Sequence, residues 1–240
     1  MGMKKGVLPM NQENGLKAQP LLETRAFIYD VLRRTFLEEP TKAFLNLIME
    51  KEFTAGFPFA EENEEIREGI AQIAAFLQEH DLKSEDEYND LHWDYTRMFI
   101  GPDKLPAPLW ESAYLNKERL LFQEQTLKVR HAYLKYQFLP KHFRQEADDH
   151  LGLELDFMYQ LSELSLKYLQ QQDFTGLSEV LEDQKAFLQD HLLKWVPELT
   201  QKILASANLA FYQGMAKILN GYLALDLEAL EELQDLMKAF

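Results

Sequence analysis

Glu146, Asp149 and His150 are the residues whose types and spacing could do chemistry. In a helix, offsets of three and four residues would place these three side chains on one face. A carboxylate that orients an imidazole suits acid–base catalysis or the binding of a basic ligand. The structural alternative is strong, because Asp148 and Asp149 are ordinary residues for the beginning of a helix. No Ser, Thr or Lys nucleophile is tied to this group, so a hydrolase that uses Asp149 and His150 is the least favoured interpretation.

A second candidate is the proline-rich loop that ends at Trp110. Gly101 and Pro102 end a helix. Pro106 and Pro108 then keep the chain extended, because proline fits neither a helix interior nor an inner strand. The large ring of Trp110 is a suitable anchor for an apolar peptide, and it is equally suited to the core; both interpretations stay open.

The helix before this loop carries Tyr95, Met98 and Phe99 at helical spacing. We interpret these side chains first as core, because residues three and four apart share a helix face. Arg97 on the same helix has a simple partner in Asp94, three residues earlier. Alternatively, the Arg97 side chain pairs with Glu111 or Asp149 across a site.

The elements that must position these residues are all helices. Apolar residues recur at helical spacing, and no long run alternates with a period of two, so we expect an all-α protein, a single globular bundle of about ten helices. Thr41 is an expected helix cap, and Ser84 with Glu87 is an expected capping box. The expected helices are 21–38, 41–49, 61–78, one from Ser84 into the proline loop, 112–122, 124–136, 148–168, 176–194, 196–207, 208–225 and 227–240.

The domain organisation follows from the same pattern. Residues 1–20 are expected to be a flexible N-terminal arm, residues 51–60 a loop, and residues 21–240 one helical domain. The connecting segment 137–147 could act as a hinge, so the protein is expected to be a monomer or a helix-swapped dimer.

Composition excludes several classes of protein. With 25 basic and 40 acidic residues the net charge is −15, which disfavours nucleic acid and favours a basic partner. The absence of cysteine excludes thiol catalysis and thiolate metal sites. No phosphate-binding loop occurs and the histidines are scattered, so we expect no cofactor and no metal. No apolar run reaches the length of a membrane span, so we expect a cytoplasmic protein without stable membrane insertion.

Three motifs together resemble the TorD/DmsD family of redox-enzyme maturation chaperones. They are Y-T-R-M-F-x-G-P at 95–102, P-x-P-x-W-E-S-x-Y at 106–114 and E-x-x-D-H-L-G-x-E-L at 146–155. Trp195 and the pair Phe211 and Tyr212 match late positions of the family. The resemblance covers most of the chain, and the order and separation of the motifs make it specific.

The resemblance implies a cytoplasmic, all-helical protein that is not an enzyme. Such a protein binds the twin-arginine signal peptide of a molybdopterin-containing oxidoreductase and holds the catalytic subunit until its molybdenum cofactor is inserted. Some family members are said to bind guanine nucleotides, but no motif here supports such a site. An alternative is an assembly chaperone of the nitrate-reductase type, whose client is not exported.

Position by position, the resemblance places peptide binding on residues that lie in the three motifs: Tyr95, Met98, Phe99, Leu109, Trp110, Asp149 and His150. The remaining motif residues are expected to shape the loop: Arg97, Gly101, Pro102, Pro106, Pro108, Ser112 and Tyr114. Met98 stands where Leu is usual and Trp110 where many relatives have Tyr, which leaves the client subgroup open. Independently, the carboxylates of Glu111, Glu146 or Asp149 would pair with the two arginines of such a peptide.

Overall fold

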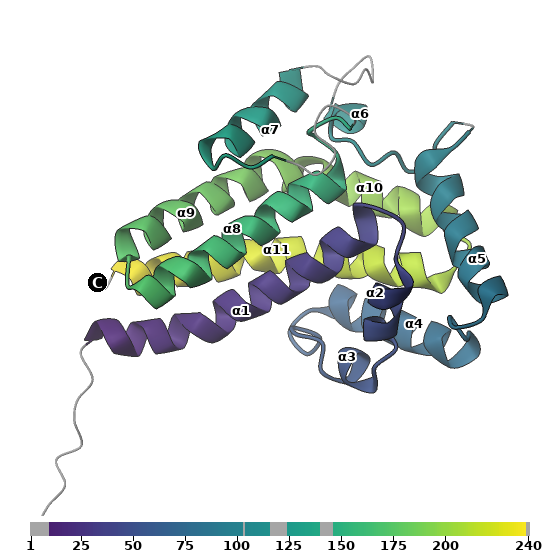
Figure 1. Cartoon of the computed structure of the whole chain (residues 1–240), viewed down its shortest axis with the longest axis horizontal. Helices are drawn as coiled ribbons and strands as arrows, with labels where there is room; N and C mark the ends of the chain where they lie inside the picture. The colour runs from purple at the N-terminus through teal and green to yellow at the C-terminus, as the bar shows by residue number, and fades with distance from the viewer. Residues whose placement is uncertain (1–9, 103, 116–123, 140–145, 239–240) are drawn as a thin grey trace, which may run out of the picture.

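The computed structural model describes residues 10–102, 104–115, 124–139 and 146–238 of the chain. In these ranges the regular structure is helical, and β-pairing is limited to one isolated bridge, so the expected all-α class is confirmed. Two short π-helical segments, which Figure 1 does not label, are named η. Figure 1 shows the arrangement of the helices. In chain order they are α1 (Met10–Phe36), α2 (Lys42–Ile48), α3 (Lys51–Ala55), α4 (Glu64–Glu79), α5 (Glu85–Tyr95), η1 (Thr96–Ile100), α6 (Ser112–Leu115), α7 (Glu124–Lys135), α8 (Leu151–Gln171), α9 (Phe174–Phe187), η2 (Leu188–Leu192), α10 (Leu193–Ser206) and α11 (Ala210–Lys238).

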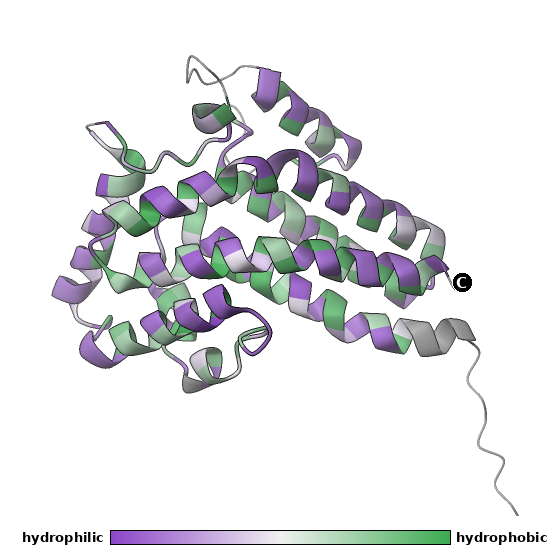
Figure 2. Cartoon of the chain, turned by 180° about the vertical axis from the view of Figure 1, so that it is seen from behind, coloured by the Kyte–Doolittle hydropathy of each residue, from purple (hydrophilic) through white to green (hydrophobic). Residues whose placement is uncertain are grey.

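The long helix α11 is the centre of the bundle. It packs against α1, α4, α9 and α10, while α1 also lies along α8 (Figure 1). Figure 2 shows hydrophobic and hydrophilic residues mixed along each long helix, as expected where one face of a helix is buried and the other is in water. The buried apolar side chains form one cluster, which extends in sequence from Ala18 to Met237.

Two glycines allow α4 and α11 to approach closely. A Cβ atom on Gly69 would lie 2.5 Å from the backbone oxygen of Gly214, and one on Gly214 would lie 2.7 Å from the backbone oxygen of Gly69. Real Cβ atoms do not tolerate such distances. Glycine at both positions therefore sets the distance between these two helices.

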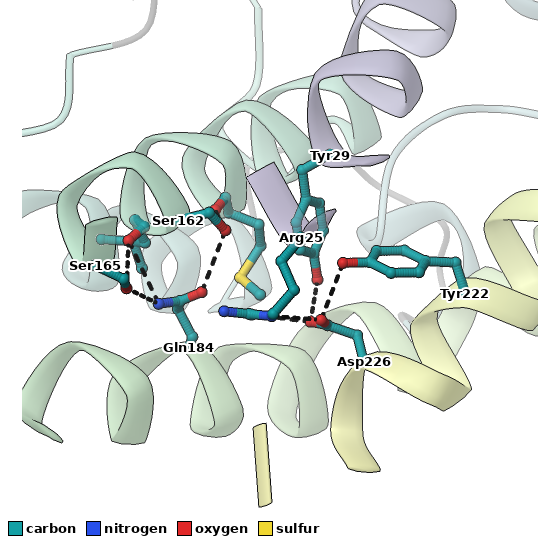
Figure 3. A network of polar contacts seen from close by, with 9 residues as sticks. Arg25, Tyr29, Ser162, Ser165, Gln184, Tyr222 and Asp226 are labelled. Carbon is teal, nitrogen blue, oxygen red and sulfur yellow. Dashed lines mark hydrogen bonds and ion pairs between the residues drawn. The ribbon is translucent and has the colours of Figure 1, made fainter. Parts of the chain in front are cut away.

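A buried ionic network joins α1 to α11, and Figure 3 shows its side chains converging on Asp226. Arg25 donates to both carboxylate oxygens of Asp226, at 2.6 and 3.1 Å. Tyr29 and Tyr222 donate their hydroxyls to the same carboxylate, at 2.7 and 3.0 Å. Both charged side chains are inaccessible to solvent. A buried charge requires an oppositely charged partner and hydrogen bonds, so the network fixes how α1 lies against α11.

The first helix begins at Met10, earlier than the expected position 21, so residues 10–20 of the expected arm are helical. Pro20 lies inside this helix and removes one backbone hydrogen bond. Ala18 and Leu22, on either side of the proline, are fully buried. Their burial offsets the lost bond.

Other helix boundaries also differ from expectation. Residues 51–55 form α3 instead of a loop, because Phe53 is buried. The expected helices 208–225 and 227–240 form one helix, α11, in which Asp226 is stabilised by Arg25. Pro197 lies inside α10 rather than in the first turn of a new helix.

The helix caps differ in part. The Thr41 hydroxyl accepts from the N–H of Phe44, as expected. Ser84 occupies the cap position of α5, but its side chain makes no capping hydrogen bond. The expected helix 112–122 is described only as far as Leu115. Residues 140–145 of the possible hinge also lie outside the described residues.

Candidate functional site

The isolated bridge joins the end of the proline loop to the segment before α8. Trp110 and His150 are the bridge partners. The N–H of Glu111 donates to the Asp149 oxygen at 2.9 Å, and the N–H of Leu151 donates to the Leu109 oxygen at 2.7 Å. The segment from residue 146 to 150 is therefore not helical, so Glu146, Asp149 and His150 do not share a helix face. The helix expected from residue 148 begins at Leu151. Two sequence motifs that lie far apart in the chain meet at this bridge.

A cavity of about 560 Å³ opens beside the bridge. Its floor is apolar, and carboxylates belong to its lining together with His150 and Trp110. The residues that line it are Leu37, Glu38, Glu39, Tyr95, Phe99, Ile100, Leu109, Trp110, Glu146, His150 and Leu153. Six of the residues expected to bind peptide are thus brought together, and their role in binding remains a prediction.

Trp110 forms a wall of this cavity and is only partly buried. Its ring nitrogen donates to the Glu146 Oε1 atom at 2.8 Å. Its ring stands edge-on to the His150 ring, with 5.5 Å between the ring centres. Trp110 therefore has one fixed orientation in which part of the ring stays accessible, as a peptide anchor requires.

Tyr95 and Phe99 are core residues that also form the cavity floor. Both are 3% exposed, and their rings pack edge to face at 5.0 Å. Met98, between them in sequence, is fully buried and does not line the cavity. The core interpretation of these residues is confirmed, and Met98 shares no surface with a ligand in the cavity.

His150 is the cap of α8. Its Nδ1 atom accepts from the N–H of Gly152 at 3.1 Å, so the proton of the neutral ring is on Nε2. Burial lowers the pKa of His150 from 6.5 to about 4, although the nearby Asp149 carboxylate opposes this shift. The ring is thus neutral at physiological pH. Gly152 is required here, because a Cβ atom would lie 2.2 Å from the Cα of Leu37.

Asp149 is fully buried and does not line the cavity. Its Oδ2 atom accepts from the N–H of Ser112 and its Oδ1 atom from the Thr126 hydroxyl, both at 2.9 Å. Neither of these hydrogen bonds involves His150. Asp149 therefore ties the beginning of α6 and α7 to α8 instead of orienting an imidazole for catalysis.

Glu111 is also buried beneath the loop. Its Oε2 atom lies 3.0 Å from the Nδ1 atom of His191, which η2 directs inward. Glu154 of α8 accepts from the Trp195 ring nitrogen at 3.3 Å. Burial raises the pKa of Glu154 well above its usual value, and the charges of Glu111 and Asp149 add to this shift. The carboxylates of Glu111 and Glu154 are fully buried, so they are inaccessible to a ligand in the cavity.

Arg97 follows the simpler of its two interpretations. Its guanidinium donates to the Asp94 carboxylate at 2.5 Å and also contacts the backbone oxygen of Ser206. Asp94 in turn accepts from the N–H groups of Asn208 and Leu209, just before α11. The pair therefore caps α11, and the expected brace to Glu111 or Asp149 is not formed.

The loop residues have the conformations that their types require. Gly101 has a φ angle of 109°, which a side chain rarely permits, and it ends η1. The Tyr114 hydroxyl donates to the backbone oxygen of Pro108 at 2.8 Å. Pro102 and Pro106 are exposed, whereas Pro108 is half-buried.

Sequence reasoning missed part of the cavity. Glu38 and Glu39 follow α1 and add two carboxylates, and Leu37 and Leu153 add apolar surface. A signal existed for the first two, since paired acidic residues directly precede the helix-breaking Pro40. No sequence signal predicted the π-helical segments η1 and η2. Such turns are frequent at functional sites.

A larger cavity, of about 840 Å³, lies between α8 and residues 136–139. Its lining includes none of the residues predicted to bind peptide. Over the described ranges, no cluster of three or more His, Asp or Glu side chains is arranged to hold a metal ion. In the same ranges, no helix combines the length and the apolar character that crossing a bilayer requires.

Comparisons with known proteins agree with this arrangement of motifs. The family described as nitrate reductase delta subunit matches residues 59–201. Chaperone protein TorD of Aliivibrio salmonicida is 29% identical over 221 residues, which are 92% of this chain and 99% of that protein. The probable Tat proofreading chaperone DmsD of Haemophilus influenzae is 30% identical over 122 residues, 51% of this chain and 53% of that protein. Because the family match spans more than half of the sequence, the chain belongs to the nitrate reductase delta subunit family, and its resemblance to the TorD/DmsD chaperones is confirmed.

Proposed function

We propose that this protein is a cytoplasmic maturation chaperone for a molybdopterin-containing oxidoreductase. It binds the twin-arginine signal peptide of the catalytic subunit and holds that subunit until its cofactor is inserted. The observation that carries the proposal is the cavity that combines an apolar floor with carboxylates. Relatives named as TorD and DmsD chaperones support the chaperone role.

The cavity complements both parts of such a peptide. Arginine pairs with carboxylates through two parallel hydrogen bonds, which lysine cannot make. Glu38, Glu39 and Glu146 supply the carboxylates, and the hydrogen bond from Trp110 holds Glu146 in place. Apolar side chains next to the arginines would be buried against the floor.

His150 contributes through its neutral state. A neutral ring adds no positive charge that would repel the arginines, and its Nε2–H group is a donor for a peptide carbonyl oxygen. The net charge of −15 also favours encounter with a basic peptide. That gain in association rate decreases as salt rises.

The proposal makes the protein a binding protein, not an enzyme. Asp149 is used by Ser112 and Thr126, and the Nδ1 atom of His150 is used by Gly152. The side-chain atoms of Asp149 and His150 that a hydrolase would need therefore accept structural hydrogen bonds instead.

The test is calorimetric titration with a twin-arginine signal peptide and with the same peptide carrying two lysines. We expect saturable binding that is weaker for the lysine peptide. Glu146→Gln keeps an oxygen acceptor for Trp110 but removes the charge, so we expect about fivefold to tenfold weaker binding. Glu228→Gln, an exposed change on α11, is the matched control and should bind as the wild type does. No binding of either peptide at tens of micromolar would refute the proposal.

A second candidate is an assembly chaperone for a client that is not exported. The family description, which refers to nitrate reductase, favours it. Isolation of the protein from cells together with a molybdoenzyme subunit that lacks a signal peptide would support this second function.

A further inference from the structure

Two large apolar side chains are exposed on the helix that supplies the cavity floor. Trp93 of α5 is 64% exposed, and Ile100 at the end of η1 is 65% exposed. Single exposed apolar residues are common on protein surfaces. These two are informative because of where they lie relative to the cavity.

One of these residues lines the cavity, and the other packs on a residue that contacts the lining. Ile100 belongs to its lining. The Trp93 ring packs edge-on against the His92 ring, with centres 4.8 Å apart. The Nδ1 atom of His92 lies 2.7 Å from the Oε2 atom of Glu39, which lines the cavity. Ile100 is therefore part of the cavity, and Trp93 is connected to the cavity through His92 and Glu39.

The cavity alone is too small for the expected ligand. The apolar stretch of a signal peptide has about 7–15 residues. Ten residues in a helix are about 15 Å long and about 10 Å across, which exceeds a cavity of about 560 Å³. Most of the stretch must therefore lie on the surface beside the cavity.

We propose that Trp93 and Ile100 form a docking surface for the apolar stretch that follows the arginine pair. This inference rests on the proposed function. The two arginines of the peptide pair with the carboxylates of the cavity. The apolar stretch leaves the cavity over Ile100 and continues towards Trp93. Arg97 lies between the two in sequence, but Asp94 and the Ser206 oxygen hold its guanidinium.

A different path is available on the other side of Trp110. A second cavity, of about 550 Å³, is lined by Leu105 and by two prolines, and also by Lys104 and Lys202. These lysines would stand close to the bound arginines, and like charges weaken association. The surface on α5 also carries a cation, Arg97, but the Asp94 carboxylate pairs with it at 2.5 Å. We therefore assign the apolar stretch to this surface.

The test compares two peptides of equal length that carry the same arginine pair. One has the natural apolar stretch, and in the other Ser and Gly replace that stretch. We expect Trp93→Ala and Ile100→Ala each to weaken binding of the apolar peptide about tenfold. The Ser/Gly peptide should be affected little. Leu134→Ala, at a 57% exposed leucine on α7, is the matched control and should change neither affinity.

Tryptophan fluorescence gives a second readout. Trp195 is buried and Trp110 is partly buried, so Trp93 is the tryptophan with the most water contact. Binding of the apolar peptide should shift the emission to shorter wavelength, and Trp93→Phe should remove most of this shift.

The outcomes separate the two proposals. If the wild type binds neither peptide, the proposed function is wrong and the inference falls with it. If the wild type binds but Trp93→Ala and Ile100→Ala bind equally well, only the inference is overturned. Loss of binding in Leu105→Ala without loss in these two variants would assign the apolar stretch to the second cavity and would also overturn it.

Discussion

The buried cap residue of α8 predicts how stability depends on pH. Burial lowers the pKa of His150 from 6.5 to about 4 in the folded protein, while an unfolded chain titrates near 6.5. Below that pH the unfolded state binds a proton that the folded state does not take up until the pH nears 4. The free energy of unfolding therefore decreases as the pH falls through this window.

The size of the effect follows from the two pKa values. Each unit of difference corresponds to about 1.4 kcal/mol. Between about pH 7.5 and about pH 4.5, linkage gives a loss of about 2.5 kcal/mol from His150 alone. This is a large share of the stability of an ordinary domain.

Urea unfolding of the wild type and of His150→Asn at these two pH values measures the effect. Asparagine keeps a cap acceptor but does not titrate. Glu154, whose raised pKa has the opposite sign, contributes equally to both proteins and cancels in the comparison. We expect the wild type to lose about 2.5 kcal/mol more than the variant. Equal losses in the two proteins would show that His150 is not buried as a neutral ring.

Two further predictions concern the bundle. Gly69→Ala places a Cβ atom 2.5 Å from a backbone oxygen of α11 and should lower the free energy of unfolding by about 1–3 kcal/mol. Gly15→Ala, which meets an ordinary 3.5 Å contact, is its control in the same thermal melts, and equal melting temperatures would contradict the close crossing. Asp226→Asn leaves the charge of Arg25 buried without its ion pair and should cost about 3–5 kcal/mol in urea unfolding. Asp235→Asn, at an exposed position on the same helix, should have no measurable effect, and a similarly small loss at Asp226 would argue against the buried network.

Local signals were sufficient for most helices. The spacing of Tyr95 and Phe99 and the stop at Gly101 are visible in the sequence, because each depends on neighbours within one or two turns. At Asp226 the sequence predicted a break between two helices, whereas the structure has one continuous helix. A buried aspartate in a helix looks like a break until its partner Arg25 is known, and that partner lies 201 residues away. Pro197 was expected in the first turn of a new helix, but it lies inside α10. Tertiary packing of this helix outweighs the local preference of proline for a helix start.

The candidate site was predictable in composition but not in layout. The motifs named Trp110, Glu146 and His150, and the structure brings these residues together at one cavity. Sequence could not show that Glu111 and Asp149 are turned inward, because burial depends on His191 and Thr126, which belong to other helices. Which acidic residue faces a ligand is decided by tertiary packing, and no motif records it.

The central place of α11 has a consequence for synthesis of the protein. This helix comprises residues 210–238, and its neighbours α1, α4, α9 and α10 are all made before it. While the chain emerges from the ribosome, the apolar faces of those helices lack a partner that is translated after all of them. Arg25 likewise has no counter-ion until Asp226 leaves the exit tunnel. Folding of the bundle therefore cannot be completed before α11 has left the ribosome, and truncation shortly before residue 210 would leave these four helices without their shared partner.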